Sequence, residues 1–178
     1  MTTLMFTKTR KVKSPTRGTQ KSAGIDFFVP EFDDDFIKDL ITKNDGIEEK
    51  LWKWGKSVDN KTVNSIMLMP HQRILIPSGI HVNIPHNYAL IVHNKSGVAT
   101  KKGLDRLAEV VDEDYQGEIH LSVVNTSNDV VYINENEKLV QLILIPVLYA
   151  DIKEVSTLEE LYPTKTQRGT GGFGSTGE

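Results

Sequence analysis

The chain has 178 residues, of which 38% are hydrophobic and 25% are charged, so it is long enough for one globular domain with a sizeable core. Its net charge of −3 is unlike that of a nonspecific nucleic-acid binder, which is normally basic. It has no cysteine for a disulfide or a thiol metal site, no apolar stretch as long as a membrane span, and no apolar core of a secretory signal. We therefore expect a single domain over 1–178 in the cytoplasm, or in the host cytoplasm if the source is viral, that binds neither nucleic acid nor membrane.

Most of the chain is typical of short strands, rich in β-branched and apolar residues and separated by turns that contain Pro, Gly, Asn or Asp. Frequent short strands with regular turns predict an antiparallel sandwich, jelly roll or barrel. The predicted strands are Leu4–Phe6, Arg73–Ile76, His81–Ile84, Tyr88–His93, Glu118–Asn125, Val130–Ile133 and Leu139–Val147.

The stretch Asp33–Gly55 departs from the β pattern, because its apolar residues recur every three or four positions, as in a helix. Asp33–Asp35 can cap a first helix, and Asn44-Asp45-Gly46 is typical of a turn before a second one. Asp45 and Glu48 have the spacing of a capping box. We therefore predict a helical hairpin at about 33–55, inserted into a β domain, whose apolar face either packs on the protein or binds a protein partner.

The tail over 166–178 is rich in glycine, which loses much backbone entropy on ordering and so does not hold a stable helix. It also carries an arginine, an aromatic ring and several hydroxyls. Arginine can grip a phosphate bidentately, hydroxyl and N–H groups can wrap its oxygens, and a Phe ring offers a flat face to a base. From its residues alone, the tail is either a disordered terminus or a flexible segment that closes over a ligand.

Three internal features carry polar groups suited to a ligand. Lys95-Ser96-Gly97 offers a cation, a hydroxyl and an open backbone, which together suit a phosphate. Glu109–Glu118 is predicted to form a β-hairpin in which Asp112 and Asp114 share a face, and a carboxylate held there can deprotonate a water. Gln141 stands inside an apolar strand and needs a partner from the backbone or from a ligand. Taken singly, each also fits an ordinary turn, acidic loop or strand.

Five segments, in this order and spacing, resemble the five motifs of the trimeric deoxyuridine triphosphatases (dUTPases). They are Ser22–Phe27, Asn94–Ala99, Glu109–Glu118, Asn136–Leu142 and Arg168–Gly177. The resemblance runs from about Ser22 to Gly177, and the insertion at 31–69 lies outside it. It implies a β jelly roll, or distorted β-barrel, that forms homotrimers with sites between subunits. It also implies hydrolysis of dUTP to dUMP and pyrophosphate, which keeps uracil out of DNA and supplies dUMP for thymidylate synthesis.

The resemblance also implies roles for residues around the base, the sugar and the metal. Asp112 matches the carboxylate that activates the water attacking the α-phosphorus. Tyr115 matches the tyrosine that packs against deoxyribose and leaves no room for a 2′-hydroxyl. Glu109 and Val111 match backbone positions that pair with uracil. Mg²⁺ is expected on the triphosphate and its waters, with no direct protein ligand, and Asp26 matches an acid near that water shell.

The remaining matches concern the phosphates and the tail. The matched phosphate-binding positions are Lys95, Ser96, Gly97 and Gln141. The tail residues that would grip the γ-phosphate and cover uracil are Arg168, Phe173, Gly174, Ser175 and Thr176, with Phe173 as the aromatic lid. These matches predict a tail that orders over bound substrate.

Three residues depart from the family pattern. Lys95 stands where the family usually has Arg, so it keeps the charge but loses the planar fork. Glu109 replaces a Gly at the uracil-contacting backbone, and Asn136 replaces a Gly whose left-handed turn Asn also tolerates. These departures bear on affinity and base selectivity more than on the class of reaction.

Two other functions stay open. A dCTP deaminase shares the implied architecture but needs a glutamate where this chain has Ser122, and Glu118 comes four residues too early. A binding module would use the helical insertion to engage a regulator or a replication partner, with catalysis secondary. A zinc enzyme is disfavoured, because the five histidines have no ligand spacing with cysteine or paired acids.

Overall fold

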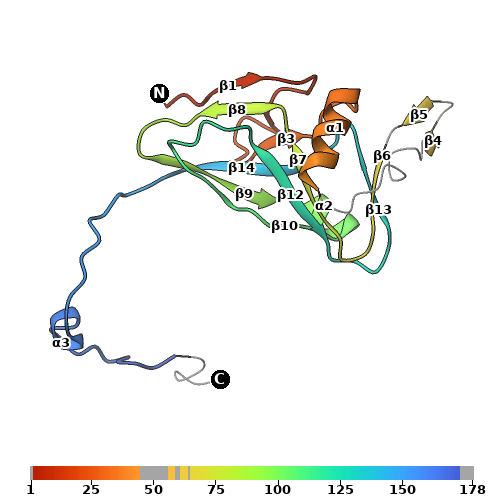
Figure 1. Ribbon diagram of the computed structural model, residues 1–178. Helices are drawn as coiled ribbons and strands as arrows, with labels where there is room; N and C mark the ends of the chain where they lie inside the picture. The colour runs from red at the N-terminus through yellow and green to blue at the C-terminus, as the bar shows by residue number, and fades with distance from the viewer. Residues whose placement is uncertain (1, 45–55, 59–60, 64, 173–178) are drawn as a thin grey trace. The chain divides into compact units, whose positions relative to one another are not determined.

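Short antiparallel strands dominate the structure, a computed structural model that describes residues 2–44, 56–58, 61–63 and 65–172 (Figure 1). The chain divides into two units, Met1–Val147 and Leu148–Glu178. The strands of the described residues lie in the first unit and dominate it, which confirms the predicted all-β class.

A five-stranded antiparallel sheet is the framework of the first unit. Its order is β11-β9-β14-β3-β2. In chain order its strands are Thr16–Arg17 (β2), Ile25–Phe28 (β3), Tyr88–Asn94 (β9), Val110–Val111 (β11) and Lys138–Pro146 (β14). The central strand β14 pairs with β9 on one side and β3 on the other, so Gln141 faces His93 across one pairing and Asp26 across the other.

Smaller antiparallel pairings complete the unit. A second sheet has the order β10-β12-β7, built from Leu104–Arg106 (β10), His120–Asn125 (β12) and Arg73–Pro77 (β7). Three two-stranded pairings join Met5–Lys8 (β1) with Ile80–Asn83 (β8), Lys56–Val58 (β4) with Lys61–Val63 (β5), and Ser65–Leu68 (β6) with Val131–Asn134 (β13). Residues buried in both sheets join one hydrophobic cluster, among them Phe27, Ile74, Leu121 and Leu142.

The strands predicted from the sequence are confirmed, with their ends moved by up to two residues. The predicted Tyr88–His93 ends one residue later in β9, and the predicted Glu118–Asn125 begins two residues later in β12. One difference concerns the insertion predicted at 31–69. Ser65–Leu68 forms β6 and pairs along its whole length with β13, so this part of the predicted insertion belongs to the β framework.

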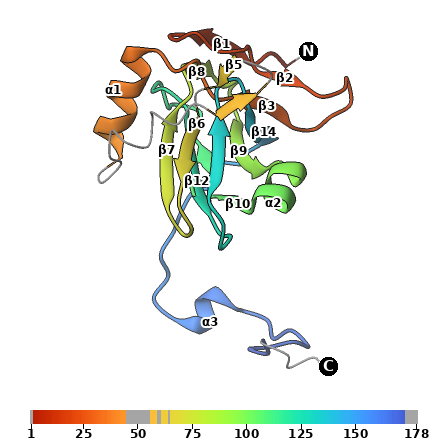
Figure 2. The same cartoon turned by 90° about the vertical axis from the view of Figure 1, so that its right-hand side faces the viewer.

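The first helix of the predicted hairpin is confirmed as α1, Asp34–Lys43, which lies beside β7 in both ribbon views (Figures 1 and 2). The Asp33 side chain caps it by accepting a hydrogen bond of 2.9 Å from the Phe36 N–H. Phe36 and Leu40, four residues apart on one helical face, are fully buried. The predicted second helix falls within 45–55, outside the described residues.

Two local predictions need correction. Lys95-Ser96-Gly97 is not a simple turn, because α2 begins at Ser96 and runs to Lys102. The predicted β-hairpin over Glu109–Glu118 is wrong, because β11 pairs with β9 whereas β12 pairs with β10 and β7. The residues between β11 and β12 form an irregular loop, so the strand alternation that placed Asp112 and Asp114 on one face does not apply.

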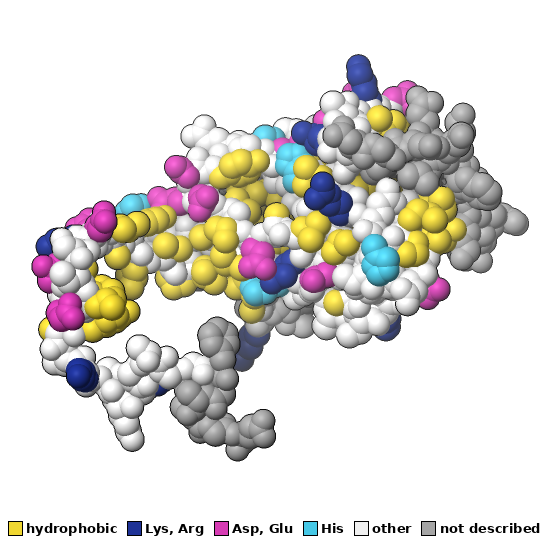
Figure 3. All heavy atoms as spheres, turned by 60° about the horizontal axis from the view of Figure 1, so that its bottom comes forward, with side chains coloured by type: hydrophobic (Ala, Val, Ile, Leu, Met, Phe, Trp, Pro, Cys, Tyr) yellow, Lys and Arg dark blue, Asp and Glu magenta, His cyan; other side chains and the backbone are white. Residues whose placement is uncertain are grey.

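The second unit contains one described helix, α3, which spans Leu158–Leu161 and is capped by the Thr157 hydroxyl. Its surface carries exposed apolar side chains interspersed with acidic ones (Figure 3). The exposed large apolar residues of this unit are Leu148, Tyr149, Ile152, Leu158, Leu161 and Tyr162. None of the helices within the described residues is both long and apolar enough for a membrane span.

Candidate active site

The strand order of the main sheet brings three motif residues together at the end of β9. Gln141 on β14 lies opposite Asp26 on β3, and its Nε2 donates a hydrogen bond of 2.8 Å to the Asn94 carbonyl at the end of β9. Gly24 permits this packing, because a Cβ there would lie 2.1 Å from Gln141 Oε1. The backbone therefore provides the partner that Gln141 needs inside an apolar strand.

A buried carboxylate holds two lysines beside these residues. Asp26 is only 3% exposed, and its two oxygens accept bonds from Lys95 Nζ at 2.5 Å and Lys138 Nζ at 2.8 Å. Burial alone raises the pKa of Asp26, but the hydrogen bonds and positive charges of Lys138 and Lys95 outweigh it and hold this pKa below its usual value. We call Asp26, Lys95 and Lys138 the lysine cluster, and its formal charge is +1.

Helix α2 starts directly beside the lysine cluster. Lys95 occupies its N-cap position, and Ser96 and Gly97 lie in its first turn, where backbone N–H groups have no partner inside the helix. A Cβ built on Gly97 would meet nothing within 4 Å, so this turn has an open side. Two ammonium groups and the start of α2 therefore make an electropositive surface that suits an anion.

The Asp112–Glu118 loop carries the predicted water-activating acid and the predicted sugar-packing tyrosine. Its turn is closed by a hydrogen bond of 3.2 Å from the Tyr115 N–H to the Asp112 carbonyl. The Tyr115 hydroxyl donates at 2.9 Å to the Glu118 carbonyl, which fixes the ring across the loop. Gly117 is required beneath that ring, because a Cβ there would lie 2.3 Å from the tyrosine oxygen.

Three side-chain contacts fasten this loop to neighbouring strands and turns. Glu113 accepts from the Asn87 N–H at 2.7 Å and contacts His86 Nδ1 at 2.8 Å. His81 Nδ1 lies 3.1 Å from the Gln116 carbonyl oxygen. Glu118 Oε1 accepts from the Gly79 N–H at 2.5 Å and from Arg10 Nε at 3.2 Å. The loop is thus held by side chains although it is not part of a β-hairpin.

A cavity of about 180 Å³ opens beside the loop. It is lined by Val92, Ala108, Glu109, Val110, Val111, Asp112, Tyr115, Ile119 and His120. The structure therefore gathers the four residues that the sequence assigned to the base, sugar and water. None of the phosphate-side residues in the described part of the chain lines this cavity.

His120 is a cavity residue to which the sequence analysis gave no role. Its Nδ1 lies 2.8 Å from the Glu118 carbonyl oxygen, so Nδ1 is the protonated nitrogen in a neutral ring that makes this hydrogen bond. Its Nε2 is buried and is the one such side-chain atom without a hydrogen-bond partner among the described residues. The missed signal was an imidazole at the start of a strand that follows directly after the Asp112–Glu118 loop.

Glu109 has a definite partner. Its carboxylate lies 2.7 Å from Arg106 Nη2, and its carbonyl accepts from the Val92 N–H at 2.7 Å. Arg106 Nε in turn donates to the Val92 carbonyl at 2.9 Å. The side chain that replaces the family's glycine is therefore engaged by an arginine at the edge of the cavity.

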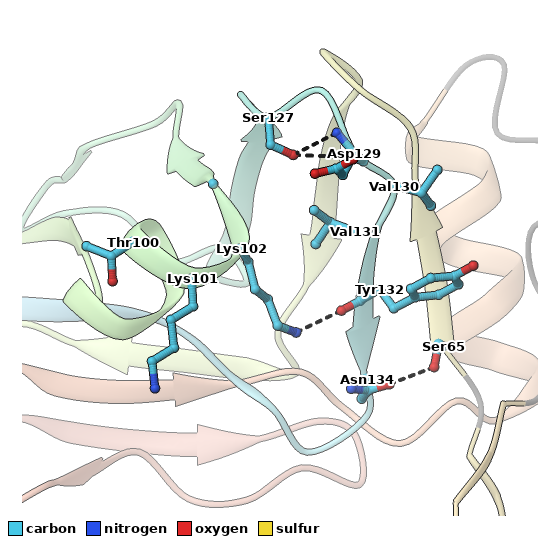
Figure 4. Close-up of a pocket in the computed structure, with 11 residues that line it drawn as sticks. Ser65, Thr100, Lys101, Lys102, Ser127, Asp129, Val130, Val131, Tyr132 and Asn134 are labelled. Carbon is cyan, nitrogen blue, oxygen red and sulfur yellow. Dashed lines mark hydrogen bonds between the residues drawn. The ribbon is translucent and has the colours of Figure 1, made fainter.

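A different cavity, of about 750 Å³, lies between the C-terminal end of α2 and β13 (Figure 4). Lys102 Nζ donates to the Tyr132 carbonyl at its edge, and Ser65 hydrogen-bonds Asn134. No predicted site residue within the described part of the chain lines it. Size alone does not identify the site, since the predicted acid and tyrosine line the smaller cavity.

The tail and the expected metal concern residues in both units. Arg168 is exposed, and its Nε donates to the Gly171 carbonyl at 2.9 Å within the second unit. Phe173, Gly174, Ser175 and Thr176 lie outside the described residues. Among the residues that the structure describes, no three His, Asp or Glu side chains form a metal-holding group. Both oxygens of Asp26 face lysines, which fits a Mg²⁺ held by substrate phosphates and water rather than by a protein cage.

An all-β fold, a cavity lined by an aspartate and a tyrosine, and two lysines around a buried carboxylate are features that suit a nucleotide-hydrolysing enzyme. A family model described as dUTPase matches residues 59–177. The deoxyuridine 5′-triphosphate nucleotidohydrolase of Chlamydia muridarum is 40% identical over 126 residues, which are 70% of this chain and 84% of that protein. That of Bdellovibrio bacteriovorus is 38% identical over 125 residues, which are 69% and 80% of the two chains. The chain belongs to the dUTPase family.

Solved structures agree on the fold. A mutant dUTPase of Staphylococcus bacteriophage 80alpha with dUpNHpp superposes with a TM-score of 0.71 at 20% identity and covers 99% of both chains. A mutant dUTPase from phage phi11 of S. aureus, with a coordinated structural Mg(II) ion, has a TM-score of 0.63 at 20% identity, over 88% of this chain and 99% of that one. This likeness confirms the predicted jelly-roll type.

Proposed function

We propose that this dUTPase hydrolyses dUTP at the α-phosphorus, releasing dUMP and pyrophosphate, with Asp112 as the base that activates water. The observation that carries the proposal is that Asp112 and Tyr115 line one cavity and belong to one anchored loop. A carboxylate fixed near a water can take its proton as the water attacks, and fixed geometry lowers the entropic part of the barrier.

Recognition of the nucleoside is assigned to the cavity beside the Asp112–Glu118 loop. The Tyr115 ring, held by its bond to the Glu118 carbonyl, would pack against the sugar and exclude a 2′-hydroxyl. The backbone of Glu109 and Val111 would pair with uracil. The ion pair between Arg106 and Glu109 supports this assignment, because it holds the Glu109 carboxylate against an arginine at the edge of the cavity.

Binding of the phosphates is assigned to the lysine cluster and the start of α2. Two ammonium groups around one carboxylate leave an excess positive charge for an anion. Ser96 and Gly97 would add a hydroxyl and backbone N–H groups, and Gln141 holds the end of β9 at this place. Asp26 would act by orienting the two lysines, close to the water shell of the metal.

Mg²⁺ is the proposed cofactor, held by the triphosphate and by water. When bound, it would neutralise phosphate charge that otherwise repels the attacking oxygen. The chain's own residues would bind the sugar, orient the water and hold the phosphates. The tail would complete the site, with Arg168 and the hydroxyls of Ser175 and Thr176 on the γ-phosphate and Phe173 and Gly174 over the base.

We further propose a homotrimer with shared sites. The cavity of about 180 Å³ is smaller than the roughly 300 Å³ at the lower end for small-molecule sites, and the described phosphate-side residues lie outside its lining. A neighbouring copy could bring its lysine cluster to this cavity.

The role of the enzyme would be to keep uracil out of DNA and supply dUMP for thymidylate synthesis in the cytoplasm. The helical part of the insertion would be available to a protein partner.

Product analysis with Mg²⁺ and dUTP, dCTP, dTTP or UTP tests the reaction. We expect dUMP and pyrophosphate from dUTP alone. Ammonia from dCTP would instead identify a deaminase, and no turnover of any nucleotide would favour a binding role for the insertion.

Asp112→Asn tests the assignment of the base. It should fold and still bind dUTP but lose turnover by at least about 100-fold, since general acid–base catalysis contributes 10²–10⁴-fold. Asp114→Asn is the matched control in the same loop. Substantial turnover in Asp112→Asn, with a loss in the control, would show that the base is misassigned.

A further inference from the structure

Helix α1 is firmly attached to the β framework although it lies in the insertion. Phe36 and Leu40 are fully buried beneath it. At its C-terminal end, Asn44 donates at 2.8 Å to the carbonyls of Leu40 and Leu75, and accepts from the Leu75 N–H at 2.7 Å. Asn44 thus ties the end of α1 to β7, a strand of the second sheet, by a pair of hydrogen bonds.

The exposed side of α1 makes a second contact, to a residue from the N-terminal segment. Asp39 forms an ion pair with Arg10, and Lys43 lies 3.6 Å from the other oxygen of Asp39. Arg10 packs tightly over Gly79, where a Cβ would lie 2.7 Å from the Arg10 Cβ and where φ is +71°. Arg10 is therefore held from below by a glycine turn and from one side by α1.

The other side of Arg10 reaches the substrate loop. Its Nε donates at 3.2 Å to Glu118 Oε1, while the Glu118 carbonyl accepts from the Tyr115 hydroxyl at 2.9 Å. The side chains of Arg10 and Glu118 are 18% and 14% exposed, so solvent screens this contact less than it screens a surface ion pair. A continuous series of bonded groups thus runs from Asp39 through Arg10 and Glu118 to Tyr115.

We propose that Asp39 and Arg10 are positioning residues, through which α1 sets the geometry of the Asp112–Glu118 loop and hence the affinity for nucleotide. The proposal rests on the sugar-packing role proposed for Tyr115. Asp39 fixes the Arg10 guanidinium, Arg10 fixes the Glu118 side chain, and Glu118 supplies the carbonyl that holds the tyrosine ring. A ligand or partner that shifts α1 would change nucleotide affinity, and by thermodynamic reciprocity nucleotide would change the affinity of that partner.

Asp39→Asn is the test, because it keeps the size of the side chain and removes the charge that fixes Arg10. KM for dUTP should rise about 5-fold, the lower end of usual coupling between sites, while kcat changes less than about 2-fold. As KM for dUTP rises, the preference of the enzyme for dUTP over UTP should fall. Hydrogen exchange of the amides in 112–118 should become faster. Lys43→Met is the matched control, since it removes the other ion pair of Asp39 and leaves Arg10 in place; it should change none of these.

A double-mutant cycle distinguishes the proposed coupling from general loosening of α1. In a Tyr115→Phe background the last bond of the series is already missing, so adding Asp39→Asn should raise KM by less than about 2-fold. Equal effects in the two backgrounds, or unchanged loop exchange in Asp39→Asn, would overturn the proposal. If the unaltered protein hydrolyses no dUTP, the proposed function fails instead, and exchange of the loop amides still decides whether α1 positions the loop.

Discussion

Replacing Asp26 with Asn would test whether one buried carboxylate holds the two lysines at the phosphate side of the site. The wild-type side chain offers a full acceptor oxygen to each of Lys95 and Lys138. Asn keeps the size of the side chain but offers one oxygen, and its NH₂ group then faces an ammonium group, which is also a donor. We expect the lysine cluster to separate and the folded state to lose stability.

The size of the effect follows from the burial of the three side chains. Removing one partner of a fully buried ion pair costs about 3–5 kcal/mol, because a charge is left without compensation. Asp26 is buried, but the side chains of Lys95 and Lys138 are 24% and 45% exposed and can turn toward water. We therefore expect a loss of about 2 kcal/mol in the free energy of unfolding, or roughly 4–8 °C in Tm for a chain of this size.

The loss of stability in Asp26→Asn should depend on pH, because only the wild-type side chain titrates. The folded-state pKa of Asp26 is lowered from 3.8, so its stabilising contribution is complete above about pH 5 and is lost as pH falls through the lower, folded-state pKa. Asn does not titrate. The difference in stability between the wild type and Asp26→Asn should therefore stay constant from pH 8 to about pH 5 and shrink below about pH 4.

Urea unfolding across this pH range, at one protein concentration, would measure the difference, since association changes apparent stability. Asp151→Asn is a suitable control, because this exposed aspartate should change stability by less than about 0.5 kcal/mol. A difference that stayed the same down to pH 3 would refute the reasoning, because the loss would then not come from the carboxylate charge.

Two further predictions concern the loop and the tail. Gly117→Ala should raise KM for dUTP about 5-fold in steady-state kinetics. The new Cβ would lie 2.3 Å from the Tyr115 oxygen and break the hydrogen bond of its hydroxyl to the Glu118 carbonyl, which is worth about 1 kcal/mol. An unchanged KM would place the tyrosine away from substrate. Deletion of 168–178 should lower turnover roughly 100-fold, as removal of a preorganised hydrogen-bond donor does in other enzymes. Calorimetry should show an unchanged Tm. A large fall in Tm would make the tail part of the core.

The strands could be predicted because alternate burial leaves a pattern in the sequence. In β12, the residues Leu121, Val123 and Asn125 face inward and their neighbours are half-buried, so the period of two is visible. Strand β3 was identified only as a motif, since Asp26, Phe27 and Phe28 are all buried and show no alternation. Helix α2 was missed because seven residues without a buried side chain give no helical period.

The candidate site was predicted as a set of residues but not as a set of contacts. The resemblance to the dUTPase motifs led to Asp112, Tyr115 and Gln141, and the cavity is lined by the first two. Pairings between distant residues follow from the register of the sheet, which no local pattern specifies. Asp26 and Lys95 are 69 positions apart, and only the order β9-β14-β3 makes them neighbours. The predicted hairpin was wrong for a related reason, because β11 is stabilised by β9 and not by the strand that follows it.

The segment after β14 bears on the proposed homotrimer. Leu148 and Ile152 are 97% and 102% exposed, and Tyr149 is 63% exposed. Burying each of these side chains would contribute about 1.5–3 kcal/mol. This segment leads to the tail with Arg168, so a neighbouring chain that covered it would also fix where the tail begins. The apolar residues would then support the proposed closure over the nucleotide together with Arg168.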